Sequence, residues 1–99
     1  MPYIRPQDVT APKELWTKHS VLIEGKAGQP AYALGTWDKK RTIGVRWNGT
    51  DDNEIGWPRV FVNPCWHIID PALLDSVIAL LPDYATKIRA MRFLNNEDI

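Results

Sequence analysis

Cys65 and His67 are the two side chains whose chemistry is easiest to name, because an imidazole that activates a neighbouring thiol creates a strong nucleophile. They lie two positions apart, with Asp70 nearby to orient the imidazole, and residues at this spacing project from the same face of a strand. Their Cβ atoms would be about 6–7 Å apart, which is loose for a direct hydrogen bond from sulfur to nitrogen. We therefore expect a buried structural cysteine and a half-buried histidine, and no catalytic residue.

A metal ion is the second chemistry to weigh. Such a site would combine the side chains that ligate metals, which are Cys65, His67, His19, Asp51, Asp52 and Glu54. Zinc takes about four ligands, usually from paired short spacings, and the chain has no second Cys or His pair. The segment 51–54 also lacks the alternating oxygen ligands of a calcium loop. We predict no metal and no cofactor, and we interpret the acidic cluster as a solvated turn.

Basic and aromatic residues in the segment 32–47 suggest a third chemistry, because a sheet that carries cations and stacking rings can bind single-stranded nucleic acid. The residues concerned are Lys39, Lys40, Arg41, Arg46, Tyr32, Trp37 and Trp47. Twelve basic residues are balanced by twelve acidic ones, however, so the chain has no long-range field that attracts phosphates. Nucleic-acid binding is kept as a lesser alternative to an ordinary solvated hairpin tip.

The five tryptophans demand an explanation of their own, because each has ~150–250 Å² to bury and a core of this size has limited room. Two interpretations stay open. Either all five pack within the domain or beneath an N-terminal arm, or some form an exposed aromatic surface. In the second case we expect Trp57 and Trp66, together with Tyr32 and Arg46, to serve a protein interface or a small-ligand cleft.

Composition predicts a single folded domain over residues 1–99, since 44% hydrophobic and 24% charged residues lie in the ordinary globular range. The longest apolar run, 77–81, is far shorter than the ~18 residues that span a bilayer. The N-terminus lacks the apolar stretch of a signal peptide, and a lone cysteine fits a reducing compartment. We expect a cytoplasmic protein without a membrane partner.

The elements that must position these residues begin with an irregular arm over 1–14, where three prolines disfavour regular structure. An antiparallel sheet is expected over 19–69, with strands at 19–26, 31–37, 41–48, 59–62 and 65–69. Residues 38–40 are predicted to form a three-residue hairpin loop that pairs Trp37 with Arg41 and Ala33 with Val45. Small residues would then oppose large ones, leaving room for a helix on that face. Pro64 is predicted to mark an edge, a bulge or a bend.

Two helices are predicted within residues 70–95. Asp70 and Pro71 are typical of a helix start, and Leu74, Val77, Ile78 and Leu81 follow the spacing of one apolar face. Pro82 ends this helix, Asp83 caps the next, and Asn95-Asn96 can end it. In the second helix Tyr84, Ile88 and Met91 repeat the apolar spacing. The order of elements predicts an α+β fold, with a small antiparallel sheet of three to five strands and two C-terminal helices packed on one face.

Three segments carry a resemblance to known proteins: GTWDKKRTIGVRWNG over 35–49, IGWP over 55–58 and NPCWHIIDPALLDSVIALLP over 63–82. Their Trp, Gly and Pro pattern resembles small uncharacterised bacterial proteins associated with mobile DNA, including gene cassettes carried by integrons. The resemblance implies a small stand-alone α+β protein and brings no known activity and no catalytic residues. His67 stands where that pattern has an aromatic residue.

Our first hypothesis is a non-enzymatic binding protein that self-associates, as a dimer, through an aromatic surface and a sheet edge. The candidate binding residues are Tyr32, Arg46, Trp47, Asp52, Glu54, Trp57, Trp66 and His67. The alternative is a small enzyme or small-molecule binder whose cleft lies between the 48–58 loop and the 63–70 segment. Arg46, Asp52, Glu54, Trp57 and His67 would line that cleft.

Overall fold

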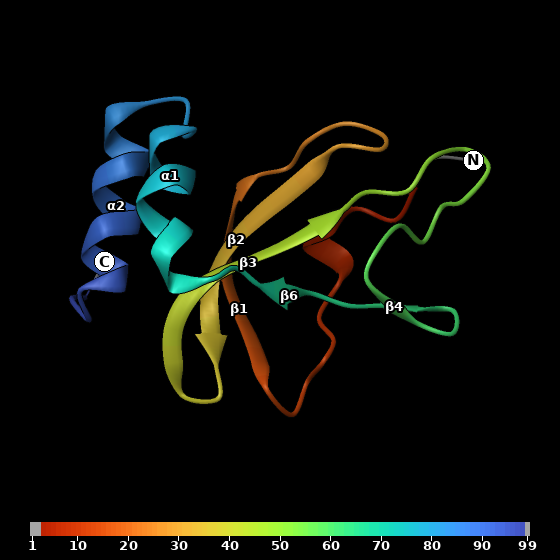
Figure 1. Ribbon diagram of the computed structural model, residues 1–99, viewed down its shortest axis with the longest axis horizontal. Coiled ribbons are helices and arrows are strands. Elements are labelled where there is room, and N and C mark those ends of the chain that lie inside the picture. The colour runs from red at the N-terminus through yellow and green to blue at the C-terminus, as the bar shows by residue number, and fades with distance from the viewer. Residues whose placement is uncertain (1–2, 99) are drawn as a thin grey trace.

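The computed structural model, which describes residues 3–98, contains a four-stranded antiparallel sheet, a separate two-stranded hairpin and two C-terminal helices (Figure 1). The main sheet has the strand order β1-β2-β3-β6. Its strands are β1 (Trp16–Ile23), β2 (Pro30–Trp37), β3 (Lys40–Trp47) and β6 (His67–Ile68). The hairpin pairs β4 (Arg59–Val60) with β5 (Asn63–Pro64). This architecture confirms the predicted α+β fold.

The tight turn between β2 and β3 contains two residues, Asp38 and Lys39, which have positive φ angles of 48° and 70°. Both central residues of a type I′ turn need such angles, and this turn suits the twist of paired strands. Trp37 therefore pairs with Lys40, and Ala33 pairs with Gly44. The predicted three-residue loop and its pairs are wrong by one residue.

The corrected register exchanges the faces of β3. Side chains of paired residues share a face of the sheet, so Ala31, Ala33 and Gly35 of β2 lie on the same side as Gly44 of β3. Ala33 thus faces Gly44 across the two strands, whereas Ala31 faces Arg46 and Gly35 faces Thr42. The predicted helix does not use this space, because the helices pack on the opposite face.

The helices cover the face that carries Leu34 and Ile43 (Figure 1). A 3₁₀ turn, η2 (Pro71–Leu73), leads into α1 (Leu74–Ala79), and α2 (Tyr84–Leu94) follows. Val77 of α1, Ala90 and Phe93 of α2, and Leu81 of the connection between the helices form one core with the sheet. No helix within residues 3–98 has the length and apolarity needed to cross a membrane.

Both predicted helix starts are confirmed by their caps. The Asp70 carboxylate accepts a hydrogen bond from the Ala72 amide at 2.9 Å, and the Asp83 carboxylate accepts one from the Thr86 amide at 2.7 Å. The predicted inner face of α2 is wrong: Ala90 and Phe93 are buried there, whereas Tyr84 and Met91 are exposed. The helix has two apolar stripes, one with Tyr84 and Met91 and the other with Ala90 and Phe93. The spacing of apolar residues alone does not determine which of them faces the sheet.

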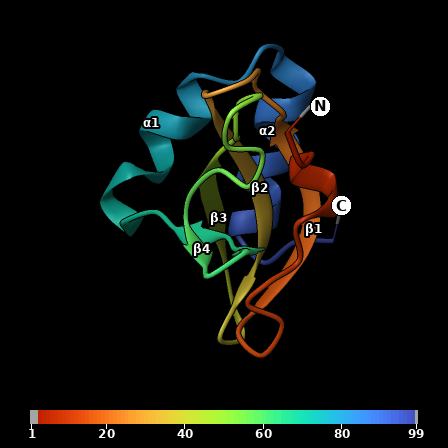
Figure 2. The same ribbon diagram turned by 90° about the vertical axis from the view of Figure 1, so that its right-hand side faces the viewer.

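The N-terminal arm covers the other face of the sheet (Figure 2). It contains one 3₁₀ turn, η1 (Pro6–Asp8), and runs beside β1, where the Lys18 ammonium donates hydrogen bonds to the carbonyls of Pro6 and Gln7. Val9 of the arm packs with Trp16, Trp66, Ala31 and Ala33 in a second core. β1 begins at Trp16, earlier than predicted, because this tryptophan pairs with Trp37 across the strands.

Gly35 and Gly44 create the space for this second core. A Cβ atom added at Gly35 would lie 2.4 Å from Cη2 of Trp16, and one added at Gly44 would lie 2.9 Å from the same atom. The Trp16 ring therefore lies directly on the backbone of β2 and β3. The small residues on this face accommodate indole rings instead of a helix.

Candidate functional site

Arg46 is fully buried, although it was predicted to line an exposed binding surface. Its guanidinium donates hydrogen bonds to the carbonyls of Cys65, at 2.7 Å, and Ile55, with longer contacts to Trp47 and Pro58. Burial lowers the pKa of Arg46, but an arginine stays protonated in proteins. Arg46 is therefore a structural cation that holds two loop segments against β3.

The contacts of Arg46 join the two segments between which a cleft was expected. Residues 55–58 and residue Cys65 meet directly here, because the Cys65 amide donates to the Pro58 carbonyl at 3.0 Å. Asp52 and Glu54 are exposed. The buried Arg46 guanidinium donates to main-chain carbonyls and not to these two carboxylates. The predicted polar lining is thus dispersed.

Cys65 is buried, as expected, and its thiol donates a hydrogen bond to the Asn63 carbonyl at 3.4 Å. The expectation of a half-buried His67 is wrong, because this residue is exposed on β6 opposite Val45. Cys65 lies between β5 and β6, so the two residues do not share a strand. Among residues 3–98, no group of three or more His, Cys, Asp and Glu side chains is placed to hold a metal ion.

The residues of the predicted nucleic-acid platform are divided between the two faces of the sheet. Tyr32 packs against the core beneath the helices, and Arg46 is buried on the arm side. Arg41 donates hydrogen bonds to the carbonyls of Phe93 at 3.0 Å and Glu97 at 2.8 Å, so it fastens the end of α2 to the sheet. Lys39 and Lys40 are exposed at the hairpin tip, and Trp47 is exposed at the other end of β3.

Two tryptophans are buried, two are exposed and Trp37 is half-buried, so the interpretation that all five pack within the domain or beneath the arm is wrong. Trp16 and Trp66 are buried, and the Trp66 indole donates to the Val9 carbonyl of the arm at 2.6 Å. Trp47 and Trp57 are 48% and 54% exposed. Trp66 therefore does not belong to an exposed aromatic surface, because its ring is needed in the core under the arm.

An exposed aromatic surface does exist, and it centres on Trp57. The backbones of Trp47 and Trp57 exchange two hydrogen bonds, of 2.7 and 2.9 Å, which places the two exposed residues side by side. The Arg59 guanidinium stacks over the Trp57 ring, 4.8 Å from its centre. From Arg59 the chain continues into the β4–β5 hairpin.

The tip of this hairpin is apolar and exposed. Phe61 is 88% exposed, and Val60 and Val62 beside it are also mostly exposed. Phe61 has a positive φ of 55°, which bulky residues rarely adopt. We call Val60, Phe61 and Val62 the knob, and the knob together with Trp47, Trp57 and Arg59 the hairpin surface. The sequence signal for the knob is three consecutive apolar residues before Asn63-Pro64, which the sequence analysis assigns to a short strand over 59–62.

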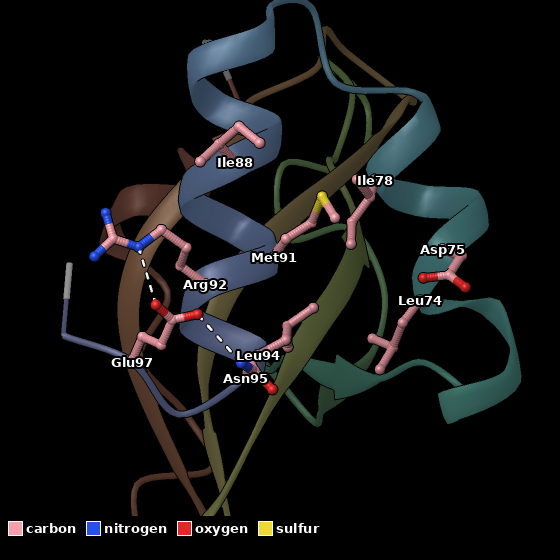
Figure 3. A pocket seen from close by; sticks show the side chains of 9 residues that line it. All are labelled: Leu74, Asp75, Ile78, Ile88, Met91, Arg92, Leu94, Asn95 and Glu97. Atoms are coloured by element: carbon pink, nitrogen blue, oxygen red, sulfur yellow. Dashed lines mark hydrogen bonds and ion pairs between the residues drawn. The ribbon is translucent and has the colours of Figure 1, made fainter.

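A groove between α1 and α2 is the second exposed apolar feature. It has a volume of about 500 Å³, within the range of about 300–1,000 Å³ that is typical of binding pockets. Its apolar lining is Leu74, Ile78, Ile88, Met91 and Leu94. Figure 3 shows Met91 and Ile78 pointing toward each other between the helices, with Asp75 on α1 and the Arg92–Glu97 pair on the outer side of α2.

Comparison of the chain with protein-family models, with curated proteins and with solved structures finds no match. No activity, ligand or partner is therefore transferred from a relative, and the candidate site rests on the geometry of this chain.

Proposed function

We propose that this protein is a non-enzymatic binding protein that self-associates through the hairpin surface. The observation that carries the proposal is the knob: three consecutive apolar side chains project from a two-stranded hairpin, and Phe61 is 88% exposed. Apolar residues that are exposed side by side mark protein interaction sites more often than singly scattered ones do. Trp and Arg, which flank the knob, are the residues enriched at the centre of protein interfaces.

The edge of the main sheet is the less favourable contact. β1 lies at one edge, but its pairing with β2 has register shifts between Lys18 and Ser20 and between Val21 and Ile23. Such bulges twist an edge and discourage the addition of another strand. The strand at the other edge, β6, has only two residues. The hairpin surface has no comparable protection, which favours it as the contact.

The test is sedimentation velocity over a range of micromolar concentrations. Phe61→Asn removes the exposed ring and is compatible with folding, because asparagine tolerates positive φ better than phenylalanine does. Leu15→Ser is the matched control, since Leu15 is also an exposed apolar residue but lies outside the hairpin surface. We expect the wild type and Leu15→Ser to associate and Phe61→Asn to sediment as a monomer. A monomeric wild type at every concentration would contradict the proposal.

A further inference from the structure

We propose that the knob of one copy docks into the groove between α1 and α2 of a second copy, in a head-to-tail contact. This inference rests on the proposed self-association and names the surface that receives the knob. It starts from two unpartnered apolar features of complementary form: a projecting tip, Val60–Val62, and a concave groove between two helices.

The two features cannot meet within one chain. The helices and the β4–β5 hairpin lie at opposite ends of the molecule's longest axis (Figure 1), and that axis extends over 39 Å. A knob therefore reaches a groove only on another molecule. The contact is heterologous, because different surfaces of the two copies meet, and repetition generates open chains or closed rings.

The groove suits an apolar tip in chemistry and in form. Five apolar side chains line it, and Met91, which is 51% exposed, can adapt its unbranched side chain to an inserted ring. The Phe61 side chain makes few contacts with its own chain, because it is 88% exposed, so it is free to enter a groove on another molecule. Insertion would remove both apolar surfaces from water.

Charge complementarity selects the same pairing. Arg59 is the only charged residue in the segment 57–64, so the hairpin surface is positive. The groove is bordered by Asp75, Arg92 and Glu97, and Arg92 forms an ion pair with Glu97 at 3.4 Å. Asp75 forms no ion pair within residues 3–98. One negative charge at the groove is thus left to meet the Arg59 that accompanies the knob.

The decisive experiment mixes two variants that each lack one half of the contact. Phe61→Asn removes the knob and keeps the groove, whereas Met91→Arg obstructs the groove and keeps the knob. Arginine is a good helix former, and position 91 is exposed, so α2 should fold normally. Tyr84→Arg is the matched control, because Tyr84 is exposed on the same helix but does not line the groove. Circular dichroism verifies that every variant is folded.

We expect each of the two variants to be monomeric alone and their equimolar mixture to form a discrete dimer that grows no further, because one intact knob meets one intact groove. The wild type and Tyr84→Arg should form larger species. If Met91→Arg still associates like the wild type, or if the mixture stays monomeric, the knob does not use the groove and the inference is overturned. The proposed function survives both of those results. Only a monomeric wild type, or unchanged association of Phe61→Asn, overturns the proposed function as well.

Exchanging the two charges provides an independent readout. Arg59→Asp and Asp75→Arg should each weaken association, by about fivefold or more if the charges meet in the contact. The doubly exchanged protein should recover part of the loss. Equal weakening without recovery would show that Arg59 and Asp75 do not face each other, and would overturn the docking geometry.

Discussion

Trp16 lies on the backbone of Gly35 so closely that a Cβ atom at position 35 would meet the indole ring at 2.4 Å. Gly35→Ala should therefore destabilise the fold by about 1–3 kcal/mol through overpacking. Urea unfolding followed by circular dichroism measures the change. In a Trp16→Leu background, which removes the ring but leaves the Thr17 carbonyl 2.6 Å from the added Cβ atom, the same substitution should cost less without becoming neutral. An equal cost in both backgrounds would show that the contact with Trp16 is not the reason for the glycine.

The buried Arg46 guanidinium should stabilise the two loop segments that it joins to β3. Arg46→Met leaves the Cys65 and Ile55 carbonyls without their donor, and each buried carbonyl left unpaired costs about 1–3 kcal/mol. Arg46→Lys keeps the charge but loses the planar fork that reaches both carbonyls, so we expect an intermediate loss. Chemical unfolding gives the two free energies. Wild-type stability in Arg46→Met would contradict the structural role assigned to Arg46.

The hydrogen bond from the Trp66 indole to the Val9 carbonyl should stabilise the docked arm. Trp66→Phe removes the donor and leaves a buried carbonyl unpaired, for an expected loss of about 1–3 kcal/mol. Trp57→Phe makes the same chemical change at an exposed ring and should change stability by less than about 0.5 kcal/mol. Hydrogen exchange of the arm amides provides a second measurement, and exchange should accelerate only in Trp66→Phe.

Asp83 predicts a pH dependence of stability. The hydrogen bond from the Thr86 amide, and after it the one from the Thr86 hydroxyl, hold the pKa of Asp83 below its ordinary value. A carboxyl that is more acidic in the folded than in the unfolded chain stabilises the fold above its unfolded pKa, and this stabilisation disappears as the pH falls through the folded pKa.

Asp83→Ala should therefore lower the melting temperature at neutral pH, and the difference from the wild type should shrink once the pH falls below about 4. Calorimetry at a series of pH values measures both effects. Asp51→Ala, which removes an exposed carboxyl outside the helices, is the control and should change neither. A difference that stays constant through the acidic range would contradict the capping role of Asp83.

Much of the fold could be predicted because its signals are local. Asp70 and Asp83 cap the backbone amides that follow them within three residues, and Pro82 separates the two helices. The strand register had no comparable signal in the sequence. It depends on the positive φ angles of Asp38 and Lys39, and neither residue type indicates such an angle as clearly as glycine does.

The candidate site was harder to predict because its residues are sorted by long-range packing. Arg46 and Trp66 are of residue types that are common at interfaces. Their donors instead bind main-chain carbonyls distant in the sequence: the Arg46 guanidinium donates to Cys65, and the Trp66 indole donates to Val9. Trp47 and Trp57 were expected in the binding set and are exposed. Phe61 was overlooked, since an apolar triplet of this kind is more often a buried strand than a hairpin tip.

The division of the tryptophans gives the protein two separate optical reporters. Trp16 lies 5.9 Å from Trp66 and 6.4 Å from Trp37 between ring centres, close enough for their electronic transitions to couple. Near-ultraviolet dichroism from these rings therefore reports the closure of the arm over the sheet. Trp47 and Trp57 lie half in solvent, so their emission colour and quenching report events at the hairpin surface. Folding and docking can thus be followed in one sample without an attached dye.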